Sequence, residues 1–350
     1  MVVIVFFFGP EKEKEMNRIV VTGANGFAGS HVLESFVENP LEDCEVVAAC
    51  RNENKLPQWF EGKKNIGDLL DSAYLEKLTN EADVICHTAA FAEMNGTVSN
   101  SNKYFFEPTK ELIEASVRNG VKRFVFLSST TSNPIANRRL HSKRALKKIW
   151  PHYYNVIRIE NLLNNLKAKG MEVVILRVGF FTGKNYSLGI LPILLPRLKT
   201  HLAPWVNHGN TSLPLTNGKD IGEAFRLSSL VELKEPLNIF DVVGKEVPTV
   251  KEVFGYLNEI YGYPLPHFNV SFKFAYTFAR FMQILHKLIP GDPLIVPAIV
   301  LLLEETSASN KRAKEILGYE PMVHWKESID IQIKEMQVRQ KSNMKMNTIS

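Results

Sequence analysis

Cysteine is scarce in this chain, and its histidines are scattered. The three cysteines, Cys44, Cys50 and Cys86, form no CxxC pair, and their odd number argues against a disulfide framework and for a reducing compartment. The nine histidines form no HxxxH pair and no cluster with a cysteine, so we expect no bound metal. These absences favour a cytoplasmic protein that folds without covalent or metal cross-links.

Long hydrophobic runs are also lacking. The apolar residues 2–8 are too few to span a bilayer and follow no basic residue, and residues 294–303 are short and interrupted by Pro297. A signal-like fragment and an additional strand are alternatives for the first run, but Met16 directly precedes the first predicted strand. We therefore interpret residues 1–15 as an extension or a start-site artefact, and the polar residues 336–350 as a disordered tail.

A strong charge of one sign is missing as well. The formal net charge is +5, which is too small to indicate a nucleic-acid partner. Basic residues do gather in one run without an acid among them: Arg138, Arg139, Lys143, Arg144, Lys147 and Lys148. We interpret this run as a solvated helix face, with contact to an anionic substrate group or an anionic lipid surface as the alternatives.

The chain does contain a glycine-spaced turn, within the stretch RIVVTGANGFAGSHVLE at residues 18–34. A β-branched run leads into Gly23, Gly26 and Gly29 at GxxGxxG spacing, and a helical pattern follows. Glycine lets the backbone turn tightly, lets a diphosphate approach, and lets the helix pack close to the strand, while the helix N-terminus faces the anion. This context favours a dinucleotide site over an ordinary tight turn.

Predicted strands and helices alternate after this turn, which favours a parallel sheet with helices on both faces. Strands are expected at 45–49, 84–87, 124–127, 173–176 and 237–242, and helices at 69–78, 109–118, 155–169 and 220–230. We predict an α/β protein. Its Rossmann-type, doubly wound parallel sheet comprises residues 16–182 and 216–245, and a smaller, mostly helical substrate domain comprises residues 183–215 and 246–335.

Several motifs in this order resemble those of the extended short-chain dehydrogenase/reductases, the NAD-dependent epimerase/dehydratase group. They are TGANGFAG at 22–29, GDL at 67–69, HTAA at 87–90, FVFLSS at 124–129 and the segment around Tyr154. KRAKEILGYEP at 311–321 resembles a C-terminal signature of the branch with 3β-hydroxysteroid and sterol dehydrogenases. The resemblance covers residues 16–327 and implies a bound nicotinamide dinucleotide and a Ser/Thr-Tyr-Lys catalytic set.

Within that resemblance, Ser129 matches the catalytic serine and Tyr154 the catalytic tyrosine. Tyr153 is the weaker alternative, because the fourth residue after it is Ile157. Arg158 stands where the family has lysine. It shares a helix face with Tyr154 and keeps the positive charge that lowers a phenol's pKa, but it stays protonated and cannot relay a proton. Packing of Tyr154 as an ordinary helix aromatic is the alternative.

The cofactor follows from the end of the second strand, where an acid would favour NAD and an arginine NADP. The chain has Cys50 and Arg51 there and no acid, so we expect NADP; a solvated Arg51 with NAD bound is the alternative. The resemblance also assigns Asp68 to the adenine and residues 88–90 to the adenosine. The expected cofactor-binding residues are Gly23, Asn25, Gly26, Phe27, Gly29, Arg51, Asp68, Leu69, Thr88, Ala89, Ala90, Tyr154 and Arg158.

Substrate preference is indicated by two segments. Nucleotide-sugar members commonly carry an Arg-Asp pair before the helix that starts here near Asp220, whereas this chain reads Ser212-Leu213-Pro214. In the second segment apolar residues recur at helical spacing, which usually indicates core; a hydrophobic substrate channel and a membrane contact are alternatives. They are Phe274, Phe278, Phe281, Leu285 and Leu288, with Lys273, Arg280 and Lys287 elsewhere on the helix.

We therefore predict an NAD(P)-dependent oxidoreductase, with NADP favoured, that interconverts a secondary alcohol and a ketone on a largely apolar small molecule. Ser129, Tyr154 and Arg158 are the expected catalytic residues. A nucleotide-sugar epimerase or dehydratase is the second hypothesis, and an NADP-binding protein with impaired catalysis, suggested by Arg158, is the third. Peripheral membrane contact and a homodimer stay open.

Overall fold

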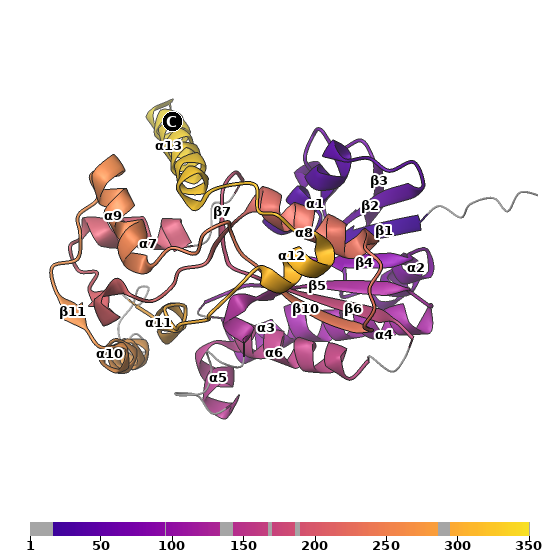
Figure 1. Ribbon diagram of the computed structural model, residues 1–350, viewed down its shortest axis with the longest axis horizontal. Helices are drawn as coiled ribbons and strands as arrows, with labels where there is room; N and C mark the ends of the chain where they lie inside the picture. Colours follow the sequence, from indigo (N-terminus) through magenta and orange to yellow (C-terminus); the bar gives the residue numbers. More distant parts are fainter. Residues whose placement is uncertain are drawn as a thin grey trace, which may run out of the picture.

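The computed structural model describes residues 17–94, 96–133, 143–166, 170–185, 190–285 and 295–349. Its centre is a seven-stranded sheet in the order β10-β6-β5-β4-β1-β2-β3 (Figure 1), and every strand pair in it is parallel. The chain builds the sheet outward from β1 to β3, then returns to the other side of β1 and continues to β10. The strands are β1 Asn17–Thr22, β2 Cys44–Cys50, β3 Lys63–Ile66, β4 Val84–His87, β5 Arg123–Ser129, β6 Glu172–Val178 and β10 Leu237–Val242.

Helices cover both faces of this sheet because the strands are apolar on both sides. In β1, Ile19 and Val21 enter one hydrophobic cluster and Val20 enters the other, as the alternation of a strand requires. The first cluster is covered by α1 Phe27–Glu38, α8 Gly218–Leu230 and α12 Lys311–Leu317. The second is covered by α2 Ser72–Asn80, α4 Glu107–Arg118 and α6 Pro151–Asn164.

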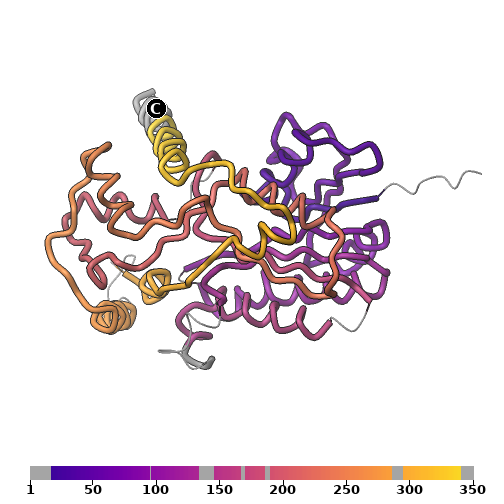
Figure 2. Tube along the Cα trace, in the orientation of Figure 1, coloured from indigo at the N-terminus to yellow at the C-terminus, as the bar shows by residue number. Residues whose placement is uncertain are grey.

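A separate hydrophobic cluster lies beyond the sheet. It joins Leu191 and Leu195 of α7, Phe254 and Leu257 of α9, and Trp325 at the start of α13. Figure 2 shows the indigo first strands toward one end of the molecule and the orange segment with these helices at the other. The elements of this end are α7 Ile190–Lys199, β8 Trp205–Val206, η4 Asn207–Gly209, α9 Val250–Tyr261, β11 Asn269–Val270, α10 Phe272–Leu285, α11 Pro297–Leu301 and α13 Trp325–Ile349.

The remaining described elements are short. They are η1 Glu53–Lys55, α3 Val98–Ser101, the π-helical turn η2 Asn102–Phe106, η3 Thr130–Ser132, α5 Lys143–Ile149, β7 Phe180–Thr182 and β9 Leu215–Asn217. The last two strands pair with each other in parallel.

The predicted fold class is confirmed, with three differences in detail. β3 was not predicted, because Lys63–Ile66 lacks an apolar alternation; it is an edge strand whose lysines suit that position. α6 begins at Pro151, four residues earlier than expected. The helix α13 continues to Ile349, through the segment for which we expected a disordered tail. Division into two domains stays a prediction, and residues 1–15 lie outside the described residues.

The amphipathic helix α10 does not bury its aromatic residues, contrary to our expectation; it buries the face that carries its alanines. Its buried residues are Ala275 and Ala279, which pack with Val300 of α11. Phe274 is 61% exposed and Phe281 59% exposed, with Phe278 and Ile284 exposed beside them. The small alanines allow a close approach to α11, so the aromatic stripe is left exposed. The helix α10 itself lies near α11 at the lower left of Figure 1. Leu285 is half-buried; Lys287 and Leu288 lie outside the described residues.

Candidate active site

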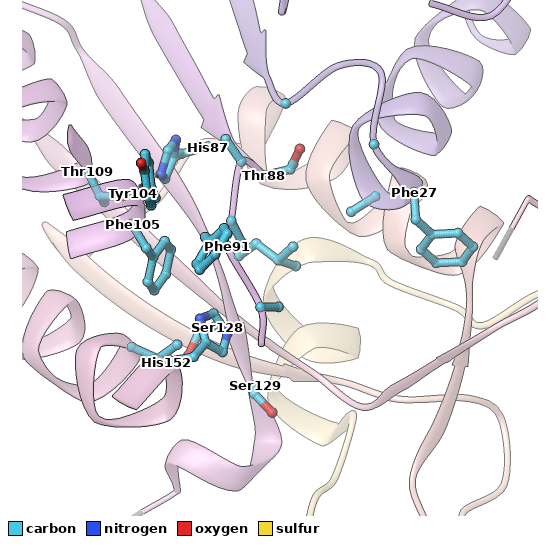
Figure 3. Close-up of a pocket in the computed structure, with 18 of the residues that line it drawn as sticks. Phe27, His87, Thr88, Phe91, Tyr104, Phe105, Thr109, Ser128, Ser129 and His152 are labelled. Carbon is cyan, nitrogen blue, oxygen red and sulfur yellow. Dashed lines mark hydrogen bonds between the residues drawn. The ribbon is translucent and has the colours of Figure 1, made fainter. Parts of the chain in front are cut away.

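A cavity of about 610 Å³ opens at the carboxyl ends of the strands. Cys50 ends β2, His87 ends β4, Ser129 ends β5 and Val178 ends β6, and all four line it. The strand order reverses between β1 and β4, which is where open α/β sheets bind ligands. Figure 3 shows Phe27 on one side of this pocket and His152, Phe105 and Phe91 on the other.

The glycine turn leaves open a space that side chains at its glycine positions would fill. Gly23 has a φ of +70°, and a Cβ there would lie 2.7 Å from the backbone of Ala89. A Cβ on Gly29 would lie 2.3 Å from the Gly23 carbonyl oxygen. Gly26 is the N-cap of α1 and has no side chain to accept from the first-turn N–H groups. A dinucleotide's diphosphate fits this arrangement of open N–H groups and the positive end of a helix.

The predicted cofactor-binding residues around that turn come together. Arg51, exposed after β2, shares the pocket wall with Asp68, whose Oδ1 accepts from the Leu70 N–H at 3.1 Å. Asn25 reaches from the turn and donates to the Asn52 carbonyl at 3.4 Å. The predicted residues that line the pocket are Gly23, Asn25, Gly26, Phe27, Arg51, Asp68, Leu69, Thr88, Ala89 and Ala90. Gly29 does not line the pocket; it lies behind these residues, where its missing side chain lets α1 pack close to the glycine turn.

Two further side chains with rings, Tyr74 and His87, line this part of the pocket, and neither is among the cofactor-binding residues predicted from the sequence. The Tyr74 ring packs where a Cβ on Gly67 would stand, and its hydroxyl donates to the Asn65 carbonyl at 3.1 Å. His87 lies buried between two threonine hydroxyls, Thr22 Oγ1 at 2.7 Å and Thr109 Oγ1 at 3.0 Å. Burial lowers the pKa of His87 to about 3, so a neutral imidazole links the ends of β1 and β4 to α4.

Ser129 lies on the pocket wall as predicted for a residue near the reacting oxygen. Its Oγ is 2.9 Å from the Thr131 Oγ1 and accepts from the Thr131 N–H at 3.3 Å. Its neighbour Ser128 also lines the pocket, and its hydroxyl donates to Glu160. That carboxylate also accepts from Arg177 at 2.7 Å, so a buried ion pair fixes the end of β5. Because these partners come from separate elements, the sequence contained no local signal for the network.

The structure departs from expectation at Tyr154 and Arg158, neither of which is among the described residues lining the pocket. The Arg158 guanidinium lies 3.3 Å from the centre of the Phe106 ring and donates to Asn155 Oδ1 at 2.9 Å. Tyr154 packs at the edge of the hydrophobic cluster that contains Trp150. The two residues do share one face of α6, as predicted, since the Arg158 guanidinium lies 5.7 Å from the centre of the Tyr154 ring. The cluster against which Tyr154 packs also contains Leu302, and both Trp150 and Leu302 line the pocket.

The residues that α6 does place in the pocket are His152, Tyr153 and Val156. The Tyr153 hydroxyl donates to the Thr131 carbonyl. The His152 ring lies 4.8 Å from the Phe105 ring, and its Nδ1 is buried with no hydrogen-bond partner in the described chain. Burial lowers the pKa of His152 to about 4. Sequence reasoning missed His152, although its spacing of four from Val156 is the spacing of one helix face.

Charge is distributed unevenly around the pocket. Of the described residues that line it, only Arg51 and Asp68 carry a formal charge, and both lie beside the glycine turn. The remaining wall, beyond Ser129, is apolar and partly aromatic. It consists of Phe91, Met94, Tyr104, Phe105, Trp150, Phe180, Ile190, Ile193 and Leu302. This half of the pocket favours an apolar ligand.

The predicted basic run contributes no described side chain to the pocket. Lys147 and Lys148 are exposed on α5, while Leu146 and Ile149 of that helix are buried. This pattern is that of a solvated helix face. Arg138 and Arg139 lie outside the described residues, and the side chains of Lys143 and Arg144 are not described either.

The described residues contain no candidate metal cluster, no membrane-spanning helix and no disulfide. Within the described ranges, no group of three or more His, Cys, Asp or Glu residues could hold a metal ion. No helix in the same ranges is both long and apolar enough to cross a bilayer. All three cysteines are free thiols, with Cys50 and Cys86 buried.

Comparison with known proteins identifies the family. The model of the NAD dependent epimerase/dehydratase family matches residues 19–228, which is more than half of the chain. This protein belongs to that family. The family member is therefore an NAD(P)-dependent enzyme of the extended short-chain dehydrogenase/reductase type, and the resemblance inferred from its motifs is confirmed.

Relatives of this family member divide between two activities. A 3-beta-hydroxysteroid dehydrogenase of Mycolicibacterium neoaurum is 23% identical over 342 residues, which cover 89% of each chain. A UDP-glucose 4-epimerase of Streptococcus mutans is 22% identical over 328 residues, covering 87% of this chain and 91% of the relative. The solved Thermus thermophilus UDP-glucose 4-epimerase in complex with NAD shares the fold, with a TM-score of 0.63, 20% identity and coverage of 91% and 99%.

Proposed function

We propose that this enzyme is an NADP-favouring oxidoreductase that interconverts a secondary alcohol and a ketone on a largely apolar substrate. The observation that carries the proposal is the uncharged, aromatic wall of the pocket beyond Ser129. Burying an apolar ligand there gains about 25 cal/mol for each Å² removed from water. A nucleotide sugar would instead bring a diphosphate, which needs cationic or N–H partners.

The cofactor half of the proposal rests on the glycine turn and the end of β2. The turn and the N-terminus of α1 would hold the diphosphate, and Arg51 would pair with a 2′-phosphate. Asp68 and residues 88–90 would line the adenosine. When bound, the dinucleotide supplies or accepts the hydride. Ser129 would donate a hydrogen bond to the substrate oxygen and hold the reacting carbon against the nicotinamide.

A second candidate, nucleotide-sugar epimerisation, is favoured by the names of the Streptococcus and Thermus relatives. Against it stands the placement of the only formally charged residues of the described pocket wall, Arg51 and Asp68, beside the glycine turn. The 3-beta-hydroxysteroid dehydrogenase relative agrees with an apolar alcohol. A cofactor-binding protein with impaired catalysis is the third candidate, because Arg158 stands at the family's lysine position.

One assay separates the three candidates. The purified full chain is incubated with NADP⁺ or NAD⁺ and a panel of 3β-hydroxysteroids, and separately with UDP-glucose. We expect NADPH to accumulate with at least one hydroxysteroid and no conversion of UDP-glucose. Conversion of UDP-glucose without net NADPH formation would establish the epimerase instead. Cofactor binding without turnover of either substrate class would establish the non-catalytic candidate.

We also propose that the exposed face of α10 contacts an anionic membrane surface. Phe274, Phe278 and Phe281 are exposed on one side of this helix, with Lys273 exposed beside them. The sequence has no acidic residue from 264 to 285. An aromatic face bordered by cations, with no acid in its own segment, complements lipid headgroups of negative charge. A contact between two copies of the chain is the competing occupant.

A further inference from the structure

The carboxylate of Glu160 lies behind the turn that carries Ser129. Glu160 follows Val156 by four residues on α6, so it stands on the helix face that reaches the pocket, one turn further along. Its side chain is 11% exposed, and it is not among the described residues that line the pocket. Figure 3 shows Ser128 and Ser129 near His152. A carboxylate behind these serines acts on a ligand only through them.

One residue before Ser129 and one after it are bonded to that carboxylate. The hydroxyl oxygens of Ser128 and Ser132 each lie 2.5 Å from Glu160 Oε1. Ser132 Oγ is also 2.8 Å from the Ser129 carbonyl oxygen, which is the second acceptor available to its one proton. A single carboxylate oxygen therefore holds the chain on both sides of Ser129.

Arg177 fixes the position of the carboxylate. Ser128 and Arg177 are partners in the parallel pairing of β5 with β6, so their side chains emerge side by side on one face of the sheet. The guanidinium donates from Nε to Glu160 Oε1 at 3.1 Å and from Nη2 to Oε2 at 2.7 Å. A buried ion pair adds little stability compared with an apolar pair of equal volume. This pair instead gives both serines an acceptor at a fixed place.

The position of the Ser129 hydroxyl depends on the turn that follows it. Ser129 Oγ lines the pocket and accepts from the Thr131 N–H at 3.3 Å, the bond that caps η3. This geometry requires that η3 keep its shape, and Ser132, its last residue, is bonded to Glu160. A displacement of about 1 Å in a catalytic site can cost about 10²-fold in rate. Small movements of this turn therefore matter for the reaction.

We propose that Glu160 and Ser132 are positioning residues for Ser129, a role that rests on the proposed alcohol oxidation. Neither side chain contacts the substrate, and no proton or hydride passes through either of them. They hold the turn so that the Ser129 hydroxyl stays in place to donate to the substrate oxygen.

A double-mutant cycle tests this role with the full chain, NADP⁺ and a hydroxysteroid. Removing a donor to the reacting oxygen costs about 10²–10³-fold, so Ser129→Ala should lower kcat at least ~100-fold. Ser132→Ala should lower kcat about tenfold, while KM and the dissociation constant for NADP⁺ stay within about twofold. In the Ser129→Ala background the same change should alter kcat less than about twofold, because no hydroxyl remains to be positioned.

Ser116→Ala is the matched control. Ser116 is a buried serine of α4 that is not among the described pocket residues, and its hydroxyl donates to the Leu112 carbonyl at 2.7 Å. This variant should keep the wild-type kcat. A merely structural role of Ser132 would lower kcat by the same factor in both backgrounds, and that result, or an unchanged kcat in Ser132→Ala, would overturn the positioning role alone. A wild type that oxidises no alcohol with either cofactor overturns the proposed function and this role with it.

A second measurement requires no variant that folds. In a crystal structure of the wild type with NADP⁺ and a ketosteroid, we expect Ser128 and Ser132 to stay bonded to Glu160. The Ser129 Oγ should lie about 2.5–3.0 Å from the ketone oxygen. A Ser132 hydroxyl turned away from Glu160, a Glu160 carboxyl in contact with the steroid, or a Ser129 hydroxyl remote from the ketone would each overturn the role, whatever the kinetics show.

Discussion

Gly29 illustrates how a single missing side chain positions the site. A Cβ there would lie 2.3 Å from the Gly23 carbonyl, which is backbone and cannot rotate away. Such overpacking costs about 1–3 kcal/mol, and it would displace the N-terminus of α1 from the diphosphate.

We expect Gly29→Ala to lower the melting temperature by several degrees and to weaken NADPH binding at least about tenfold, a change worth ~1.4 kcal/mol. Calorimetry and fluorescence titration measure the two effects. Gly255→Ala is the matched control, because Gly255 lies in α9 with nothing within 4 Å of the added Cβ. That variant should bind NADPH normally and be slightly more stable, since alanine favours a helix. Unimpaired binding by Gly29→Ala would contradict this account of the glycine turn.

Arg51 decides the cofactor preference in our proposal. A hydrogen bond to a charged group is worth about 1.5–3 kcal/mol, so Arg51→Ala should weaken NADPH binding roughly 10–100-fold. NADH binding, which involves no 2′-phosphate, should change little. Lys55→Ala is the control, since Lys55 is an exposed cation nearby that does not line the pocket. Equal losses for NADPH and NADH would show that Arg51 does not read the 2′-phosphate.

At the scale of elements, α6 shows why a helix beside the pocket was predicted and the residues that it places in the pocket wall were not. The motif spacing led to Tyr154 and Arg158, which do share a face. The face that enters the pocket carries His152 and Val156 instead. Residues two apart on a helix of 3.6 residues per turn point about 200° apart, so selecting 154 rather than 152 selects nearly the opposite side.

The helix α10 gives the prediction for the membrane proposal. Burying one phenylalanine is worth about 1.5–3 kcal/mol, so Phe274→Ser combined with Phe281→Ser should reduce vesicle binding at least about tenfold. The measurement is co-sedimentation of the full chain with vesicles of phosphatidylcholine and phosphatidylserine. Val37→Ser, which changes an exposed apolar residue on α1, is the control and should bind as the wild type does.

Two outcomes would contradict the membrane contact. The wild type would fail to sediment with the anionic vesicles, or the double variant would sediment as well as the wild type. If the wild type is instead a dimer that the double variant dissociates, as size-exclusion chromatography would show, the face joins two copies of the chain.

At the scale of the whole molecule, Asp220 ties the sheet-covering helices to the C-terminal segment. It lies buried in the first turn of α8, and its Oδ1 accepts from the Met322 N–H at 2.7 Å. Its Oδ2 is buried without a hydrogen-bond partner in the described chain. Burial raises the pKa of Asp220 from 3.8 to about 6. The folded protein therefore holds the proton on this carboxyl up to a higher pH than the unfolded chain does.

The sign of the pH effect follows from that preference. The stability contributed by protonated Asp220 is fully present below about pH 4 and is lost as the pH rises through about 6. The loss amounts to about 3 kcal/mol at 1.36 kcal/mol for each pH unit. Asp220→Asn cannot ionise, so its unfolding free energy should lack this fall between pH 4 and 8. Denaturant titrations across that range measure the difference, and Glu259→Gln, at an exposed position on α9, should keep the wild-type slope.

The sequence by itself determined the sheet, the glycine turn and the family. Strand alternation and the freedom of Gly23 to adopt a positive φ are properties of short segments, and the structure reproduces them. The residues that gather around the turn, such as Asp68 and Ala90, were also predictable, because carboxyl ends of neighbouring parallel strands meet at one edge.

Only the tertiary structure determined which face of each helix is buried. The orientation of α10 depends on α11, which lets Ala275 and Ala279 approach closely and leaves Phe274 and Phe281 outside. The orientation of α6 depends on the neighbours that hold it, which include Asn102 for Arg158 and the Thr131 carbonyl for Tyr153. A periodic sequence determines that a helix has two faces. Which face is buried depends on the packing of segments distant in the chain.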